Sequence, residues 1–484
     1  MSVLASLALL LAQDPSYDTR VLETGGRGDR LVARDLNGDS FPDLVVQNDH
    51  DLHFFLFDRE RGFTATAQQT IRLDGTVFLW TLARLEEGKP PSLVTAGSRA
   101  IQAHSFGGRG FAARGADLVV HPSLFEDASD GGPPLFTDFA PDLDADGISE
   151  LLLFRKDDIF IMKGGPAAGY RCLQKLPLPV EVTLIHNWGA NMKMTETSAV
   201  PPLAFGDTDG DGRPDVSYYR DEAIGTFRQN PDGSFVPADP MDILTDKPKK
   251  RDRFVKFDIP PRVADLNGDG LLDIAAVYPT KGRVHVFYGR PGRRDFSQPD
   301  EVKQVADGWS SGIYLEDLGG RGRLDLIMGV VRRFGISGGI QVFLSGKVDL
   351  ELHIYPMQAN GQFPRDPVQE LKFPIPYLLQ VTRTSAMIDL TFRPNFKGDF
   401  NGDGLRDMLV ADGDRTLRIY PGSRDRGISE KPSGSIAMNP PEGTVRTEPF
   451  VADFNRDGIS DLVLKHVQTD LVRHALEIKL SKPR

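Results

Sequence analysis

Six nine-residue stretches of this chain carry side-chain oxygens at positions one, three, five and nine. The clearest is residues 265–273, Asp-Leu-Asn-Gly-Asp-Gly-Leu-Leu-Asp, which leads directly into an apolar run. Ca²⁺ takes six to eight oxygen ligands, so a tight turn with four such side chains and a nearby carbonyl can wrap one ion. Glycine at position six supplies backbone angles that other residues rarely adopt. The spacing therefore predicts a calcium-binding turn in each stretch.

The predicted ligands are the residues at positions one, three, five and nine of the six stretches. They are Asp35, Asn37, Asp39 and Asp43; Asp142, Asp144, Asp146 and Glu150; Asp207, Asp209, Asp211 and Asp215; Asp265, Asn267, Asp269 and Asp273; Asp399, Asn401, Asp403 and Asp407; and Asp453, Asn455, Asp457 and Asp461. An EF-hand loop begins in the same way but needs Glu at position twelve. Here position twelve is apolar, as at Val46 and Ala276, which excludes that motif.

Charge is consistent with bound calcium. The six stretches hold 20 carboxylates, which repel one another when no cation lies between them. The formal net charge of the chain is −11, and six Ca²⁺ ions would bring it to about +1. An acidic chain of this kind is not expected to bind nucleic acid.

Two further stretches keep the length and the apolar frame but lose ligands. Residues 317–325 have Gly319 and Arg321 at positions three and five, and residues 84–92 have Arg84 at position one. We expect the Arg321 guanidinium to take the place of the ion in its own stretch.

The eight stretches begin at residues 35, 84, 142, 207, 265, 317, 399 and 453, each between short apolar segments. A period of this length with short strands is typical of a repeat array such as a propeller. The sequence predicts an all-β fold, a single propeller over residues 13–484 with eight four-stranded blades. Each turn would join strands one and two of its blade, and seven blades would remain if 84–92 were not a repeat. A strand over 19–24 is expected to close the last blade as its outer strand, which removes an open edge.

These stretches resemble FG-GAP/VCBS-type repeats, which build integrin alpha-chain propellers and many bacterial exported proteins. The resemblance covers nearly all of the chain after residue 12 and implies calcium, about six ions, at the ligands given above. Ser40 stands where the first copy should have Gly, and Glu150 replaces Asp at position nine. The integrin propeller has seven blades, whereas eight copies predict eight.

The N-terminus predicts export. Residues 3–12 form an apolar run that is too short to span a bilayer and fits the core of a signal peptide over residues 1–12. We expect a secreted or periplasmic protein with no membrane span. Cys172 is the single cysteine, so no internal disulfide can form, and we expect it in the core.

Long connections are predicted between strand four and the next strand one, at 122–138, 187–200 and 240–258. They would lie on the face opposite the calcium turns and form a ligand surface. Trp80, Trp188 and Trp309 would pack near it or stack on a sugar there. The basic run 247–253 is read as a solvated loop.

Two short motifs have simpler explanations than function. Gly308–Gly312 matches a nucleophile elbow but precedes a strand rather than a helix, and 27–29 is an Arg-Gly-Asp tripeptide in a Gly-rich loop.

The sequence thus predicts a monomeric, non-enzymatic binding or scaffold module for a protein or carbohydrate partner. The alternative is an enzyme that acts on polysaccharides, because some polysaccharide lyases resemble this calcium-rich fold.

Overall fold

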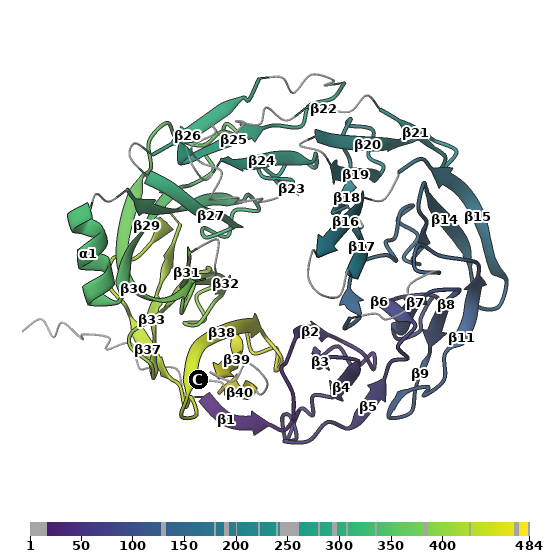
Figure 1. Ribbon diagram of the computed structural model, residues 1–484, viewed down its shortest axis with the longest axis horizontal. Coiled ribbons are helices and arrows are strands. Elements are labelled where there is room, and N and C mark those ends of the chain that lie inside the picture. The colour runs from purple at the N-terminus through teal and green to yellow at the C-terminus, as the bar shows by residue number, and fades with distance from the viewer. Residues whose placement is uncertain are drawn as a thin grey trace, which may run out of the picture.

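The computed structural model describes residues 17–126, 132–178, 181–187, 193–199, 201–220, 223–238, 241–242, 261–278, 281–292, 298–305, 308–333, 336–381, 386–424, 427–468 and 474–482. Eight small antiparallel sheets stand in a ring, and strand one of every blade except blade 3 faces the middle (Figure 1). The predicted all-β propeller of eight blades is confirmed, and residues 84–92 belong to a blade of their own. None of the helices described is long and apolar enough to cross a membrane.

The first half of the ring holds blades 1 to 4. Blade 1 contains β2 (Arg30–Arg34), β3 (Asp43–Asn48), β4 (Asp51–Phe55) and β5 (Gln69–Arg72). Blade 2 contains β6 (Val77–Ala83), β7 (Ser92–Gly97), β8 (Ala100–His104) and β11 (Ala116–Val120), with a small hairpin of β9 (Phe106–Gly107) and β10 (Gly110–Phe111). Blade 3 contains β13 (Leu151–Phe154), β14 (Ile159–Gly165) and β15 (Gly169–Leu176), and the hairpin of β16 (Glu181–Asn187) and β17 (Lys193–Ala199) follows it. Blade 4 contains β18 (Leu203–Gly206), β19 (Asp215–Arg220), β20 (Ala223–Gln229), β21 (Phe235–Pro237) and β22 (Met241–Asp242).

The second half holds blades 5 to 8. Blade 5 contains β23 (Arg262–Ala264), β24 (Asp273–Tyr278), β25 (Arg283–Phe287) and β26 (Glu301–Gln304). Blade 6 contains β27 (Gly308–Glu316), β28 (Asp325–Arg332), β29 (Lys347–Tyr355), β30 (Gln369–Val381) and β31 (Ala386–Leu390), with helix α1 (Ile336–Ser345) between its second and third strands. Blade 7 contains β32 (Asn395–Gly398), β33 (Asp407–Ala411), β34 (Thr416–Tyr420) and β37 (Gly434–Ala437), with the hairpin of β35 (Gly422–Ser423) and β36 (Gly427–Ile428). Blade 8 contains β38 (Thr444–Ala452), β39 (Asp461–Gln468), β40 (His474–Ser481) and β1 (Tyr17–Leu22).

The N-terminal strand closes the ring, as predicted. β1 pairs antiparallel with β40, from Tyr17 opposite Ser481 to Leu22 opposite Leu476 (Figure 1). The Lys479 ammonium reinforces the closure, because it donates to Thr19 Oγ1 at 2.9 Å and pairs with Glu477 at 2.8 Å.

Strand two is largely buried, because neighbouring blades cover both of its faces, and in blades 1, 3 and 5 all of its residues are buried. In blade 1, Leu44 packs with Phe454 of blade 8, whereas Val45 packs with Trp80 of blade 2. This explains why an apolar run, rather than an alternating one, follows each turn. Fully burying one such side chain contributes about 1.5–3 kcal/mol, so the ring is stabilised mainly by contacts between blades.

Blade 3 differs from the four-stranded prediction. Its sheet has three strands. The segment expected as strand one instead forms β12 (Leu135–Phe136), which pairs parallel with β6 of blade 2. The rest of that segment accepts two bonds from β13 and its flank, Leu152 N to Phe139 O and Glu150 N to Pro141 O, both at 2.8 Å. Prolines at 133, 134 and 141 lack the N–H groups that a full ladder requires.

The structure places several single residues and short motifs for which there were expectations from the sequence. Cys172 is exposed on an outer strand, so its placement in the core was wrong. Trp80 is fully buried and donates to Gln47 Oε1 at 2.8 Å, which rules it out for sugar stacking. The 308–312 motif lies within β27 and is not an elbow. In the 27–29 tripeptide, Asp29 turns back to accept from Asp49 N at 2.8 Å.

Other expectations fall on residues outside those described. These are the signal peptide 1–12, Trp188, the basic run 247–253, and parts of the connections 122–138, 187–200 and 240–258.

Candidate metal centres

Each predicted calcium turn leads into strand two of its blade, directly from strand one except in blade 3, and its position-nine carboxylate is the anchor. Asp273 is the first residue of β24 and is completely buried. It accepts a hydrogen bond from Leu266 N, at position two, at 2.8 Å and another from Gly289 N, beyond strand three, at 2.6 Å. The same two bonds recur at Asp43, Asp215, Asp325, Asp407 and Asp461. One side chain thus fastens the turn to two strands.

The remaining ligand side chains are held by backbone N–H groups of their own turn. Asp265 accepts from Gly268 N at 2.7 Å and from Gly270 N at 2.8 Å. Asn267 Oδ1 accepts from Asp269 N at 2.9 Å, and Asp269 Oδ1 accepts from Leu271 N at 2.9 Å. These bonds fix the side chains of positions one, three and five within a single turn.

Positive φ angles occur at two positions of the turn. Position six has φ values of 87° at Gly270 and 77° at Ser40, so the first copy places a serine in the left-handed region. Position four also has positive φ, which the sequence did not reveal, because Ala145 (59°) and Arg456 (53°) stand there without glycine. Both residues are held in the geometry that the turn requires.

The residues fit a hard cation. Asp142, Asp144 and Asp146 bring one carboxylate oxygen each to within 4.8 Å of one another, and so do Asp207, Asp209 and Asp215. Two buried oxygens of these turns, Asp209 Oδ1 and Asp453 Oδ1, accept no hydrogen bond within the described part of the chain. A buried carboxylate oxygen without a donor is costly, and a coordinated cation would satisfy it.

Burial raises the pKa of the position-nine carboxyls. The pKa of Asp273 rises to about 7, chiefly through burial. Hydrogen bonds from two backbone N–H groups lower this pKa, whereas the nearby charges of Asp269 and Asp265 raise it further. The pKa also rises to about 7, chiefly through burial, at Asp43, Glu150, Asp407 and Asp461. A bound cation would keep these groups ionised at neutral pH.

A family model of the FG-GAP-like repeat matches residues 265–328 and 399–464, which contain the turns of blades 5 to 8. These two matches and the eight-bladed ring (Figure 1) together fit an FG-GAP repeat β-propeller, and we call the repeated turns FG-GAP turns. A search of curated proteins found no match.

Three solved structures illustrate the similarity. An Agrocybe aegerita lectin described as recognising non-reducing terminal N-acetylglucosamine is 15% identical, with a TM-score of 0.44 over 84% of this chain and 94% of that chain. A putative 6-phosphogluconolactonase from Bacteroides uniformis is 13% identical, with a TM-score of 0.35 over 84% and 96%. The periplasmic gluconolactonase PpgL of Pseudomonas aeruginosa is 13% identical, with a TM-score of 0.34 over 87% and 96%. Similarities this distant give no indication of ligand or activity.

Protein cations approach three of the FG-GAP turns. In blade 6, the guanidinium of Arg321 bonds the position-nine carboxylate of Asp325, and its Nη1 donates to Arg424 O at 3.3 Å. In blade 3, the Lys163 ammonium bonds Asp144 and lies 3.5 Å from Glu150 Oε1.

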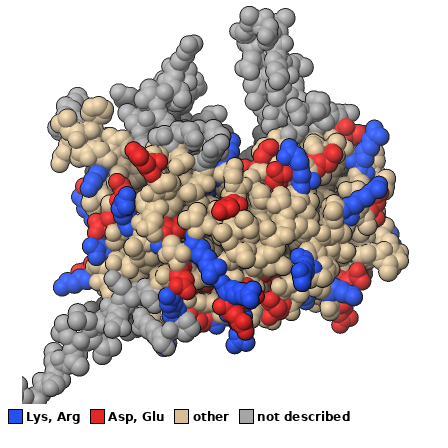
Figure 2. Space-filling view, turned by 90° about the horizontal axis from the view of Figure 1, so that it is seen from below, with Lys and Arg blue, Asp and Glu red and all other residues tan. Residues whose placement is uncertain are grey.

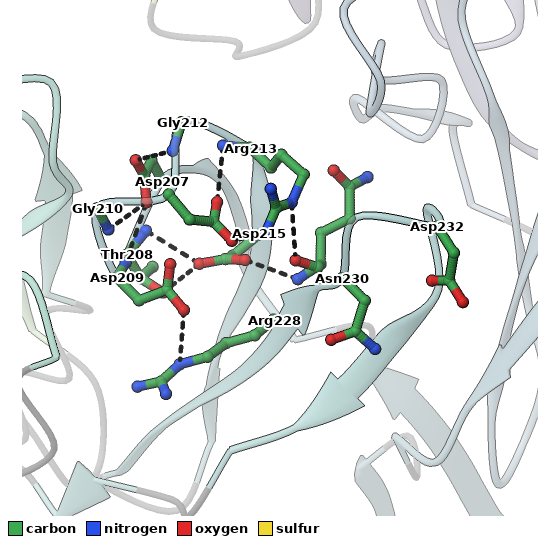
Figure 3. Close-up of polar contacts among 12 residues, drawn as sticks. Asp207, Thr208, Asp209, Gly210, Gly212, Arg213, Asp215, Arg228, Asn230 and Asp232 are labelled. Atoms are coloured by element: carbon green, nitrogen blue, oxygen red, sulfur yellow. Dashed lines mark hydrogen bonds and ion pairs between the residues drawn. The ribbon is translucent and has the colours of Figure 1, made fainter.

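In blade 4, Arg228 Nε lies 3.7 Å from Asp209 Oδ2, while Arg213 bonds Asp211 and donates to Gln229 O at 3.1 Å (Figure 3). Of these cations only Arg321 was singled out from the sequence. Lys163 and Arg228 could also have been found in the sequence, because both lie the same number of residues after position nine of their turns.

Neighbouring FG-GAP turns are linked through the backbone. The N–H of position eight donates to a carbonyl at position one or two of the preceding turn, as in Leu272 N to Asp207 O at 2.8 Å and Ser460 N to Asp399 O at 2.6 Å. Two more such bonds are Ser149 N to Arg84 O and Leu324 N to Leu266 O, both at 2.8 Å. Proline occupies position eight in the turns of blades 1, 2 and 4, at Pro42, Pro91 and Pro214, and has no N–H to donate.

Proposed function

We propose that this chain is an exported, calcium-stabilised propeller that binds a partner without catalysing a reaction. The partner is a protein or carbohydrate, and it binds on the face opposite the FG-GAP turns. The observation that carries the binding role is a cavity at the start of the innermost strands.

Calcium binding is supported by the donor set and its charge. In the intact turns the 24 predicted ligand side chains are all carboxylates or carboxamides, and Asp209 and Asp453 each keep a buried oxygen that accepts no hydrogen bond in the described chain. These oxygens would coordinate the ion. Because the position-nine carboxylate belongs to strand two and bonds the end of strand three, the bound ion would stabilise both strands. When bound, the ion supplies positive charge that offsets repulsion among the carboxylates.

The cavity has a volume of about 950 Å³ and lies among the strand-one starts of blades 2, 4 and 5. Each FG-GAP turn follows the end of strand one, so the starts of these strands lie at the opposite face. Blade 3 contributes to the lining because its strand-one segment is displaced toward β6. The lining residues are Phe78, Leu79, Phe125, Gly132, Pro133, Leu135, Thr137, Asp138, Pro201, Pro202, Leu203, Ala204, Phe205 and Val263.

The lining is apolar and aromatic, with Phe78 and Phe125 stacked at a centroid distance of 4.6 Å and Leu135 64% exposed. Such a surface suits apolar side chains of a protein segment better than a polyhydroxylated sugar, which needs many hydrogen-bond partners. We therefore favour a protein partner over a carbohydrate.

Binding is favoured over lyase chemistry by the same lining. Among the described residues, Thr137 and Asp138 provide its polar side chains, and Asp138 its single ionisable group. Elimination from a uronate polymer needs a positioned base, a positioned acid and neutralisation of the substrate carboxylate. A lone carboxyl does not supply these three.

The test is binding of the full chain to a peptide array rich in apolar residues and, in parallel, to a glycan array, both in calcium buffer. We expect peptide binding that Leu135→Glu abolishes, because the charge would enter the apolar lining. Val302→Glu, at a residue 46% exposed on the outer strand of blade 5, is the matched control and should bind as the parent chain does. Glycan binding lost in the same variant would instead favour the carbohydrate partner.

The outcome that would overturn the binding role is turnover. Release of unsaturated sugars from pectin-like polymers, abolished by Asp138→Asn, would establish the enzyme alternative. Export has a separate test: the mature N-terminus of the secreted protein, determined by mass spectrometry, should lie directly after Ala12.

A further inference from the structure

One residue on strand three lies opposite position nine of each turn. Among the six intact FG-GAP turns its type depends on whether position three is Asp or Asn. Each strand register begins one residue after position nine, and extending it by that residue places Leu56, Lys163, Arg228, Tyr288, Pro421 and Leu480 there, in blades 1, 3, 4, 5, 7 and 8. The two cations occur in blades 3 and 4. These are also the two blades whose turns have Asp rather than Asn at position three.

Both cations reach the position-three carboxylate. Lys163 Nζ bonds Asp144 and lies 3.7 Å from Asp146 Oδ2 and 3.5 Å from Glu150 Oε1. Arg228 Nε lies 3.7 Å from Asp209 Oδ2, as the dashed line in Figure 3 marks. The extra carboxylate and the cross-strand cation therefore form a pair in each of the two turns.

The pair equalises charge. In blade 3 the four carboxylates of the turn and Lys163 sum to a formal charge of −3, which is the charge of a turn with Asn. In blade 4, Arg228 offsets the extra carboxylate in the same way, and Arg213 adds a further positive charge. An ordinary ion pair at a partly exposed position would contribute little to stability and would have no reason to follow position three. A cation a few ångströms from a Ca²⁺ position, by contrast, directly opposes the ion.

We propose that Lys163 and Arg228 set the calcium affinity of their two turns, holding it near that of the turns with Asn. The inference rests on the calcium binding of the proposed function and adds a role for residues outside the ligand set. Arg213 also bonds Asp211 in blade 4, so blade 3 gives the cleaner test.

The experiment is a titration of the calcium-free full chain with CaCl₂ in competition with a chromophoric chelator, which resolves stepwise dissociation constants. Lys163→Met should tighten one site by about tenfold or more, because a positive charge beside the ion is removed. The exposed Lys347→Met is the control, since it makes the same change in net charge at the start of β29, the end of strand three that lies away from the turn of blade 6, and it should leave every site unchanged.

A double variant separates charge from packing. Asp144→Asn together with Lys163→Met gives blade 3 the side chains of a turn with Asn, and its affinity should return to that of the parent chain. Arg228→Met provides a second case and should tighten the site of blade 4. Melting temperatures of all variants in calcium check that they fold.

The possible failures are distinct. If the parent chain binds calcium but Lys163→Met and Lys347→Met titrate identically, the inference is wrong and the calcium-stabilised propeller stands. If the parent chain binds no calcium, both are wrong.

Discussion

The turns of blades 5 and 6 are neighbours in the ring and share a frame but not a chemistry. Asp273 and Asp325 are both buried, begin strand two, and accept bonds from position two and from beyond strand three. At positions three and five, however, blade 5 has Asn267 and Asp269, whereas blade 6 has Gly319 and Arg321. Both turns also have positive φ at position six.

This comparison separates the turn that builds the blade from the ligands that bind an ion. Blade 6 keeps Asp, Gly and Asp at positions one, six and nine, which hold the conformation of the turn, while glycine and arginine replace the oxygen ligands of positions three and five. Calcium is therefore expected to stabilise blade 5 and to be dispensable in blade 6, where the guanidinium lies against the same carboxylate.

The largest expected effect comes from removing calcium altogether. Chelation should lower the melting temperature by roughly 10 °C or more, because each site held at 100 times its Kd contributes about 2.7 kcal/mol. Differential scanning calorimetry with and without chelator measures the shift, and millimolar calcium should reverse it. An unchanged melting curve would exclude structural calcium.

Removing the anchor carboxylate should be nearly as severe within one blade. Asp273→Ala and Asp325→Ala should each cost about 4 kcal/mol, because two buried backbone N–H groups lose their acceptor. The cost of Asp273→Ala should shrink after chelation, and that of Asp325→Ala should not. Denaturant unfolding in both buffers tests this, and equal shrinkage in the two variants would contradict the distinction between the turns.

The pH dependence of stability should differ between the calcium-free and the calcium-bound protein. Burial raises the pKa of Asp273, Asp407 and Asp461 from 3.8 to about 7, so the calcium-free fold holds protons more tightly than the unfolded chain does. Their stabilisation is complete below about pH 4 and is lost as pH rises through 7. Protein stripped of calcium should melt at a higher temperature at pH 5 than at pH 8. Protein saturated with calcium should lose this dependence, and the same slope in both forms would argue against carboxylate coordination.

A smaller effect tests whether the two frames are equivalent. Gly270→Ala and Gly322→Ala each place a side chain at positive φ, 87° and 69°, with open space around the new Cβ. The cost is therefore conformational alone, about 1–2 kcal/mol in each case. Urea unfolding should give similar values for both. A much lower cost in blade 6 would mean that its turn is not held in the same conformation.

The smallest effect on stability, and the sharpest on binding, should come from converting one turn into the other. Gly319→Asn with Arg321→Asp gives blade 6 the ligand set of blade 5, and the calcium stoichiometry should rise by one. Gly319→Asn alone retains the arginine and serves as the control. An unchanged stoichiometry in the double variant would show that the frame of blade 6 cannot accommodate the ion.

Much of the fold could be predicted because its signals are local and repeated. Each turn begins and ends within nine residues, and the buried second strand follows at once. The three-stranded sheet of blade 3 was not predicted. Its strand one is absent because prolines weaken that segment and because β6 of the neighbouring blade pairs with part of it, and the second cause is not visible in a local sequence pattern. The partnership of Lys163 with Asp144 also escaped, since it depends on strand register rather than on the turn itself.

The exposed surface could be anticipated only in outline. The acidic composition is visible in the sequence, but how the charges are distributed is not. On the wall of the ring in Figure 2, basic and acidic side chains are interspersed rather than gathered by sign. The cavity was likewise expected only as a face, because its lining comes from four blades that no local pattern connects.

The pairing of β1 with β40 has a consequence in time as well as in space. Thr19 and Lys479 meet across 460 positions of the chain, so no ribosome-bound intermediate can make this contact until synthesis has passed residue 479. The other seven blades can form in the order of synthesis, but the ring stays open, with an unpaired strand edge, until the eighth is complete. Closure of the ring therefore depends on β40, and a chain truncated before residue 474 should be left prone to aggregation and to proteolysis.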